Sequence, residues 1–185
     1  RHILRVRGMG AAYANRGIPV GVTGWDFDGQ EIFKRAVHGM TEASQAALGR
    51  AGLAIGDIDL VVPHQANQRI IDFVGKRIGA DPAKVFVTVS RYGNMSAATV
   101  PVALVDAIEE GRVTPGATIL TPAFGGGLTY CAHVIQWGGR STPLGTATVD
   151  LPPCDKSALE MVRDIIAVKG RAGDATAALA APLVA

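Results

Sequence analysis

The sequence has no long apolar run and no strong excess of charge of either sign. None of its apolar stretches approaches the roughly 18 residues that a membrane-spanning helix needs, so we expect no membrane contact. The 18 basic and 16 acidic residues give a net charge of +2. This balance argues against a general nucleic-acid-binding protein, although it is compatible with a local basic surface.

Cysteine is also scarce, since only Cys131 and Cys154 are present. Their number and spacing fit neither a zinc site nor a disulfide framework. We therefore expect no metal, a reducing environment and a cytoplasmic location. Cys131 lies in an apolar run, which is typical of a packed core residue. The sequence starts at Arg1 without an initiator Met or a signal-peptide pattern, and we expect it to begin inside a longer protein.

Hydrophobic residues make up 48% of the 185, which predicts a packed globular body. A strand is expected at Ile3–Val6, within a lead-in of loop and strand. Prolines suggest a linker before a second capping pattern, formed by Ser157 and Glu160. The predicted divisions are a lead-in over 1–27, a main domain over 28–140, a linker over 141–156, and a short helix with a disordered tail over 157–185.

Within the main domain, helical and strand patterns alternate. One helix is expected to begin at the capping pattern of Asp28 and to end near Gly52, and a second to run from Asn67 to Gly79. Either Ser96 or Thr99 is expected to cap a third helix. Strands are predicted at 58–62, 85–89, 118–121 and 129–137. The alternation predicts an α/β unit with α-helices layered on a mixed β-sheet, because the last two strands are joined by a short loop.

Polar residues follow two of these predicted strands. His64 comes directly after the first strand and Asn94 follows the second. A neutral imidazole N–H and a carboxamide NH₂ are uncharged donors, and two donors converging on a carbonyl oxygen stabilise an enolate or oxyanion. The glycine loop Gly125–Gly127 allows the backbone to approach a substrate closely. The sequence therefore suggests an oxyanion-type pocket, with no obvious nucleophile.

Each of these features also has a plainer explanation. A single histidine after a strand is commonly a structural hydrogen-bonding group, and Gly-Asn is commonly a turn. Three glycines in a row are weak evidence for any ligand. Basic residues on predicted helices are commonly solvated, and this applies to the set Lys34, Arg69, Lys76 and Arg77.

Three segments, taken in order, go beyond these separate patterns. They are His64–Ile71 (His-Gln-Ala-Asn-Gln-Arg-Ile-Ile), Gly93–Ala98 (Gly-Asn-Met-Ser-Ala-Ala) and Phe124–Thr129 (Phe-Gly-Gly-Gly-Leu-Thr). Together they resemble the C-terminal half of β-ketoacyl-acyl-carrier-protein synthase III, a family of the thiolase superfamily. The resemblance runs from about residue 28 to 137 and implies a thiolase-like half.

The resemblance implies an acyltransferase of fatty acid biosynthesis that joins an acyl group from acyl-CoA to malonyl-acyl carrier protein and needs no cofactor. His64 and Asn94 would bind the malonyl thioester carbonyl and stabilise the enolate formed on decarboxylation. The backbone N–H of Gly126 would serve the acyl-enzyme oxyanion, and Phe124 would favour loss of CO₂. Acyl carrier protein would dock on the basic set Lys34, Arg69, Lys76 and Arg77.

The resemblance also implies what lies outside this chain. The family's nucleophilic Cys belongs to the N-terminal half, which we expect as a partner, and neither cysteine here replaces it. We therefore expect this chain alone to be inactive and the complete enzyme to be a homodimer. The family usually ends near Trp137, so no counterpart is expected for 141–185.

Two other functions remain open on the sequence. A related enzyme could acylate sugars or natural-product intermediates with the same fold. Alternatively, the chain could be a non-catalytic structural or carrier-docking subunit that pairs with a separate Cys-bearing chain.

Overall fold

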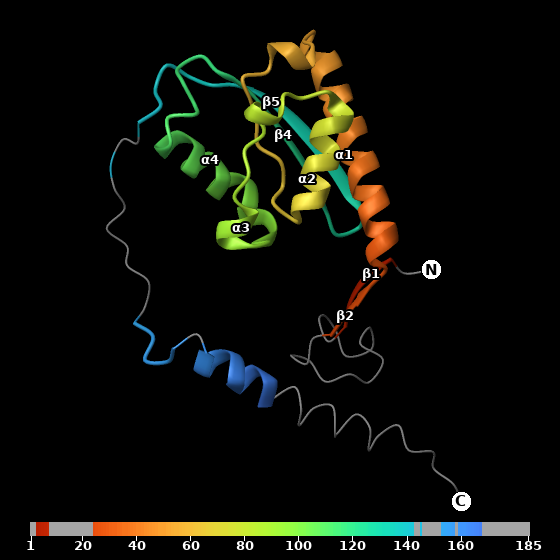
Figure 1. Ribbon diagram of the computed structural model, residues 1–185, viewed down its shortest axis with the longest axis vertical. Helices are drawn as coiled ribbons and strands as arrows, with labels where there is room; N and C mark the ends of the chain where they lie inside the picture. Colours follow the sequence, from red (N-terminus) through yellow and green to blue (C-terminus); the bar gives the residue numbers. More distant parts are fainter. Residues whose placement is uncertain (1–2, 8–23, 143–144, 146–152, 158, 168–185) are drawn as a thin grey trace, which may run out of the picture. The chain divides into compact units, whose positions relative to one another are not determined.

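The computed structural model describes residues 3–7, 24–142, 145, 153–157 and 159–167 (Figure 1). The chain divides into two compact units. One contains Asp28–Gly145 together with Ile3, and the other contains Leu4–Phe27 and the segment after Gly145. In the described part of the chain, no helix is long and apolar enough to cross a membrane.

The second unit contains a pair of short antiparallel strands. β1 (Leu4–Arg7) pairs with β2 (Gly24–Phe27), with Leu4 opposite Phe27 and Arg7 opposite Gly24. The strand predicted at Ile3–Val6 is thus present, shifted by one residue, whereas β2 was not predicted. A helix at 159–167 follows Ser157, whose backbone N–H donates to Glu160 Oε2 at 2.7 Å. The tail predicted to be disordered, 170–185, lies outside the described residues.

The first unit is built on a three-stranded mixed sheet. Its strands are β3 (Leu60–Val61), β4 (Thr118–Gly125) and β5 (Thr129–Gln136), in the order β3-β4-β5. β3 runs parallel to β4, and β4 runs antiparallel to β5. The predicted mixed α/β architecture is therefore confirmed, because a short loop joins β4 to β5 while helices separate β3 from β4.

Two helices begin and end where the sequence predicts. In α1 (Gly29–Ala51), the Asp28 side chain accepts from the Glu31 N–H at 3.2 Å. In α2 (Gln68–Ile78), the Asn67 side chain accepts from the Arg69 N–H at 2.9 Å. Both helices end at a glycine with a positive φ, Gly52 at 67° and Gly79 at 76°. Such side-chain caps satisfy backbone N–H groups that have no partner inside the helix.

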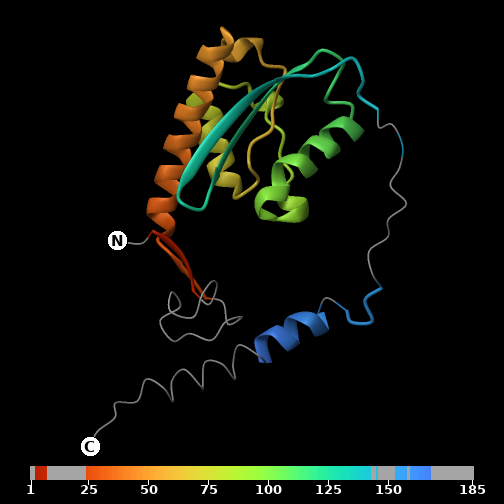
Figure 2. The same cartoon turned by 180° about the vertical axis from the view of Figure 1, so that it is seen from behind.

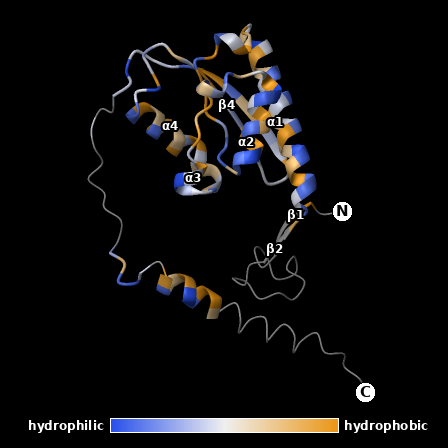
Figure 3. Ribbon diagram, viewed as in Figure 1, coloured by the Kyte–Doolittle hydropathy of each residue, from blue (hydrophilic) through white to orange (hydrophobic). Residues whose placement is uncertain are grey.

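Helices cover both faces of this sheet. α1 and α2 pack on the face that carries Val61 and Leu120, and α4 (Thr99–Glu109) packs on the face that carries Leu60 and Ile119. Figure 2 shows β4 and β5 beside α1, with α4 across the sheet. Figure 3 shows hydrophobic and hydrophilic residues interleaved along α1 and α2, as expected for helices with one buried face.

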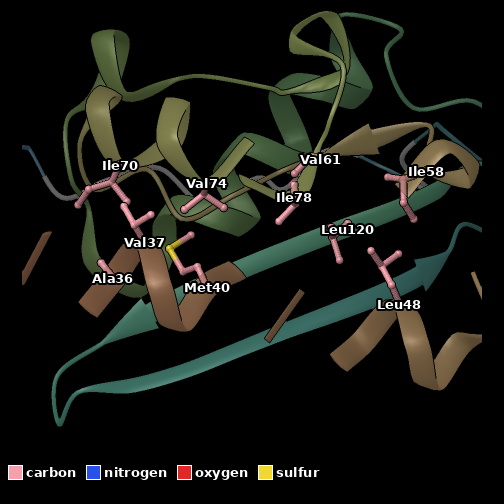
Figure 4. Close-up of a cluster of buried hydrophobic side chains, with 10 residues drawn as sticks. All are labelled: Ala36, Val37, Met40, Leu48, Ile58, Val61, Ile70, Val74, Ile78 and Leu120. Carbon is pink, nitrogen blue, oxygen red and sulfur yellow. The ribbon is translucent and has the colours of Figure 1, made fainter. Parts of the chain in front are cut away.

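The larger of the two buried clusters joins these helices to the sheet. Met40 of α1 and Val74 of α2 are at most 1% exposed, and both belong to the same cluster as Leu120 of β4 (Figure 4). Burial of each such side chain stabilises the fold by about 1.5–3 kcal/mol. The ten members are Ala36, Val37, Met40, Leu48, Ile58, Val61, Ile70, Val74, Ile78 and Leu120.

The strand predicted at 85–89 is wrong. Only Val85 forms a bridge, parallel to Val61, and the chain then enters a short helix, α3 (Val89–Tyr92). The reason is the side chain of Gln65, whose Oε1 accepts from the backbone N–H of Thr88 at 2.7 Å and of Val89 at 3.1 Å. A side-chain amide therefore takes the hydrogen bonds that a neighbouring strand would otherwise take.

The prediction that Cys131 is a core residue is also wrong, because Cys131 is exposed. Side chains alternate between the two faces of a strand. Ala132 and Val134 of β5 pack on the cluster beneath α1. Cys131 points to the opposite face, where the cluster beneath α4 reaches only as far as Ile135 and Trp137.

Candidate functional site

His64 lies at the end of the parallel ladder between β3 and β4. Its backbone N–H donates to the Pro122 carbonyl at 2.9 Å, which continues the pairing beyond Val61. The residue is 9% exposed, and its ring Nδ1 lies 2.5 Å from Thr99 Oγ1. Burial lowers the pKa of His64 below its ordinary value of 6.5, because desolvation disfavours the charged imidazolium. The imidazole is therefore neutral at pH 7.

Phe124 forms an apolar wall beside this imidazole. It lies on β4 two residues after Pro122, so its side chain is on the same face of the strand. The two ring centroids are 5.4 Å apart and the ring planes meet at 73°, an edge-to-face contact. A polar group bound at His64 would thus meet a hydrophobic ring on one side.

Asn94 lies in the loop between α3 and α4. Its Oδ1 accepts from the Ser96 N–H at 2.9 Å. Because the backbone N–H must face an oxygen, this bond fixes the amide orientation and leaves the NH₂ group as the end that can contact a ligand. Gly93, just before it, has φ 67° and ψ −160°, a backbone conformation that residues other than glycine rarely adopt.

A run of polar contacts connects the Asn94 loop to His64. The Ser96 N–H holds Asn94, the Ser96 carbonyl lies 3.1 Å from Thr99 Oγ1, and Thr99 Oγ1 contacts His64 Nδ1. These contacts thus connect His64 and Asn94, which the sequence places after two different predicted strands. The expectation that Ser96 or Thr99 caps α4 is wrong, since the N-cap is Ala98 without a side-chain bond. The Thr99 hydroxyl is directed to His64 instead.

Gln65 is a positioning residue that the sequence reasoning missed. It is completely buried, and its amide makes four hydrogen bonds. Nε2 donates to the carbonyls of Pro63 at 2.8 Å and Phe86 at 3.2 Å, while Oε1 accepts the two N–H groups that begin α3. It therefore ties the backbone beside His64 to the segment that leads to Asn94. A glutamine directly after an apolar strand was the available signal, because a buried amide must be fully bonded.

The helix α3 is held in turn by α4. Arg91 Nη2 lies 2.8 Å from Glu110 Oε1, and Arg91 Nη1 lies 3.2 Å from Asp106 Oδ2. The Tyr92 hydroxyl donates to Asp106 Oδ1 at 3.2 Å. These contacts fix the end of α3 next to the Asn94 loop.

The glycine loop connects β4 to β5 at the end of the sheet where Phe124 lies. Gly126 is exposed, and a Cβ built on it would meet no atom within 4 Å. Gly127 is the position that requires glycine, because its φ is 139° and a Cβ there would lie 3.0 Å from the Thr129 side chain. Any role of Gly126 therefore rests on its backbone N–H alone.

The four residues of the predicted basic set are all exposed, one on α1 and three on α2, and are here called the basic face (Lys34, Arg69, Lys76 and Arg77). The Arg69 guanidinium lies over the Phe33 ring at 5.3 Å, and Phe33 meets Phe73 edge to face at 5.4 Å. These contacts join α1 to α2. Phe73 remains 49% exposed, so an exposed aromatic ring lies next to the basic face.

Residues 48–137 match the family model described as the C terminal of 3-oxoacyl-[acyl-carrier-protein (ACP)] synthase III. The chain belongs to the β-ketoacyl-acyl-carrier-protein synthase III family, and the residues that match are those of that family's C-terminal part. A synthase III 2 of Vibrio cholerae is 48% identical over 166 residues, which are 90% of this chain and 46% of that relative. The chain thus spans about half the length of this relative.

Solved structures of the same thiolase-like fold agree with this assignment. The synthase III of Thermus thermophilus superposes with a TM-score of 0.61 at 46% identity, over 63% of this chain and 36% of that one. The priming β-ketosynthase of the R1128 polyketide pathway superposes with a TM-score of 0.64 at 32% identity, over 73% of this chain and 40% of that one.

The expectation that residues 141–185 have no counterpart in the synthase III family is wrong. The Vibrio cholerae relative matches 166 of the 185 residues. At most 19 residues (185 less 166) are therefore unmatched, which is fewer than the 45 residues of that segment. The expectation was taken from where the family usually ends, near Trp137, and the match to this relative continues beyond that point.

Proposed function

We propose that this chain is the C-terminal half of a condensing enzyme of fatty acid biosynthesis. The enzyme joins an acyl group from acyl-CoA to malonyl-acyl carrier protein and releases CO₂. The observation that carries the proposal is the run of polar contacts from Asn94 to His64, with Phe124 packed against the imidazole. Family membership supports it.

In the proposed reaction, the bond between the malonyl α-carbon and its carboxylate breaks. The electron pair passes to the thioester as an enolate, and the carboxylate leaves as CO₂. His64 Nε2–H and Asn94 NH₂ donate to the enolate oxygen, and such uncharged donors stabilise the developing charge without being moved themselves. Phe124 provides an apolar surface on which the carboxylate is poorly solvated. The enolate carbon then attacks the acyl thioester, and the cysteine thiolate leaves.

The proposal assigns the acylated cysteine to an N-terminal half. A cysteine at a helix N-terminus forms a thiolate readily, whereas Cys131 lies on β5 and Cys154 follows Pro153. The Gly126 backbone N–H is assigned to the oxyanion of the acyl-enzyme. The chain alone is then inactive, and the complete enzyme is proposed to be a cytoplasmic homodimer.

Substitution of the two donors in the full-length protein tests the reaction. His64→Ala or Asn94→Ala should lower the rate of malonyl decarboxylation by about 10²–10³-fold, the usual loss on removing one oxyanion donor. Acylation of the cysteine by acyl-CoA, measured by mass spectrometry, should persist in both variants. Gln45→Ala, an exposed change on α1, serves as the control. Unchanged decarboxylation in either donor variant would refute the assignment.

A second candidate keeps the fold and changes the substrates. The similarity to the R1128 priming β-ketosynthase, at a TM-score of 0.64, favours an acyltransferase of natural-product biosynthesis. Assays of the full-length protein with malonyl-acyl carrier protein and with other acceptors distinguish the two. Turnover with a non-malonyl acceptor alone would select the second candidate.

A further inference from the structure

Thr99 contacts two acceptors but has one hydroxyl proton. Its Oγ1 lies 2.5 Å from His64 Nδ1 and 3.1 Å from the Ser96 carbonyl. A threonine hydroxyl donates one hydrogen bond and can accept others. If it donates to His64, Nδ1 is unprotonated and the neutral ring carries its proton on Nε2. If it donates to Ser96, His64 must donate to it, and Nε2 has no proton.

The two distances favour donation to His64. The Ser96 contact, at 3.1 Å, is longer than the about 2.5–3.0 Å that is usual for a hydroxyl donating to an oxygen. The His64 contact is shorter than a usual hydrogen bond between nitrogen and oxygen, about 2.7–3.2 Å, so the two atoms are in close contact. The surroundings agree, because Thr99 is fully buried and His64 is nearly so, whereas Ser96 is exposed and water can bond its carbonyl. No other hydroxyl is needed to satisfy Nδ1.

We propose that Thr99 is a positioning residue that holds His64 with its proton on Nε2, facing the substrate. Nδ1 is occupied by Thr99, so Nε2 is the ring nitrogen that remains for a ligand. Only this tautomer lets a neutral His64 donate to a carbonyl oxygen. The inference rests on the proposed function for its catalytic consequence but not for the tautomer itself.

The position of Thr99 explains how one hydroxyl serves both halves of the site. Thr99 is the first residue of α4, and the Asn94 loop leads directly into it. Its hydroxyl is therefore placed by the same turn, Ser96–Ala98, whose Ser96 N–H orients the Asn94 amide. A shift of this turn would change the orientation of the carboxamide and the protonated nitrogen of the imidazole together.

Heteronuclear NMR of the full-length protein, with ¹⁵N-labelled histidine, tests the tautomer directly. The couplings and shifts of the ring nitrogens should identify Nε2 as the protonated nitrogen of His64 at neutral pH. The His64→Gln variant assigns the signal. A protonated Nδ1 in the wild-type protein would overturn the proposal, whatever the enzyme's activity.

Two substitutions separate the hydroxyl from its packing. Thr99→Ser keeps the hydroxyl and should keep the tautomer, with malonyl decarboxylation within a few-fold of wild type. Thr99→Val keeps the volume, and a population with protonated Nδ1 should appear. The kcat of Thr99→Val should fall at least about tenfold, with KM little changed. For comparison, a wrong histidine tautomer lowers kcat by up to about 10⁴-fold in a serine protease.

A buried threonine elsewhere supplies the matched control. Thr41 of α1 is 8% exposed, and its hydroxyl donates to the Val37 carbonyl at 2.7 Å. Thr41→Val should leave both the tautomer and kcat unchanged. If Thr99→Val also leaves the tautomer unchanged, the proposal is wrong. If no variant or wild-type protein decarboxylates malonyl thioesters, the proposed function fails, while the NMR result still decides the role of Thr99.

Discussion

At the scale of single residues, the site depends on burial of a titratable group. His64 is 9% exposed and packs against Phe124, so its pKa is lowered from the ordinary value of 6.5 by loss of solvation. A buried neutral imidazole is suited to donate a hydrogen bond to a developing enolate. The same burial makes His64 a source of pH-dependent stability, because the unfolded chain binds a proton at a higher pH than the folded one does.

The sign of this effect can be predicted. As pH falls through 6.5, the unfolded state gains a proton on His64 that the folded state does not yet bind. The free energy of unfolding should therefore decrease, by about 1.4 kcal/mol for each pKa unit between the two states. Urea denaturation at about pH 7.5 and pH 5.5 should show a larger loss for wild type than for His64→Gln.

His38 provides the comparison for this experiment. Its side chain is 65% exposed on α1, where it lies 3.3 Å from Glu42. His38→Gln should lose stability with falling pH as wild type does. If His64→Gln loses as much stability as wild type over this range, the burial argument for His64 is wrong.

At the scale of elements, one side chain replaces a strand contact. Gln65 joins the exit of β3 to the segment before α3 through hydrogen bonds to Pro63, Phe86, Thr88 and Val89. Gln65→Leu should retain the approximate volume but leave four backbone groups, three buried and one partly buried, without partners. Each such group costs about 1–3 kcal/mol, so urea denaturation should show a loss of at least about 3 kcal/mol.

Gln68 is the control for this change. It lies on the exposed surface of α2, and its Nε2 donates to Asp72 at 2.8 Å. Gln68→Leu should change the free energy of unfolding by less than about 0.5 kcal/mol, as surface substitutions usually do. Equal effects of the two changes would show that Gln65 does not join the elements as described.

The difference between predicted and missed features follows from distance along the chain. Asp28, Asn67, Gly52 and Gly79 act on backbone within a few residues, so local patterns predicted the ends of α1 and α2. Gln65 acts across 21–24 residues and Thr99 across 35. Such bonds depend on how the elements pack, which no local pattern contains. The strand predicted at 85–89 failed for this reason, although its residues favour a strand.

At the scale of the whole molecule, we propose that the described site is one part of a larger enzyme. The chain spans 46% of its Vibrio cholerae relative, and two large hydrophobic residues on the α3–α4 side, Tyr92 and Val105, are 45% and 52% exposed. We propose that the N-terminal half covers this side. The basic face on α1 and α2 then remains available to the carrier protein.

The basic face gives a prediction that separates docking from chemistry. Arg69 lies over Phe33, next to the exposed ring of Phe73, so a carrier protein would meet charge and apolar surface together. In the full-length enzyme, Arg69→Glu or Phe73→Ala should raise the KM for malonyl-acyl carrier protein by about tenfold or more, since anionic partners are steered by complementary charge. The rate with malonyl-CoA, which lacks the carrier protein, should be nearly unchanged.

Arg50 makes the control for charge. It is exposed in the last turn of α1, 16 positions from Lys34 (50 less 34), or about 24 Å along the helix. Arg50→Glu changes the net charge as Arg69→Glu does, but at the end of α1 opposite to Lys34 and to Phe33, the ring that Arg69 contacts. Only the Arg69 effect should decline as salt is added, because screening weakens exposed charges. Equal effects of the two changes would mean that net charge, and not a docking surface, attracts the carrier protein.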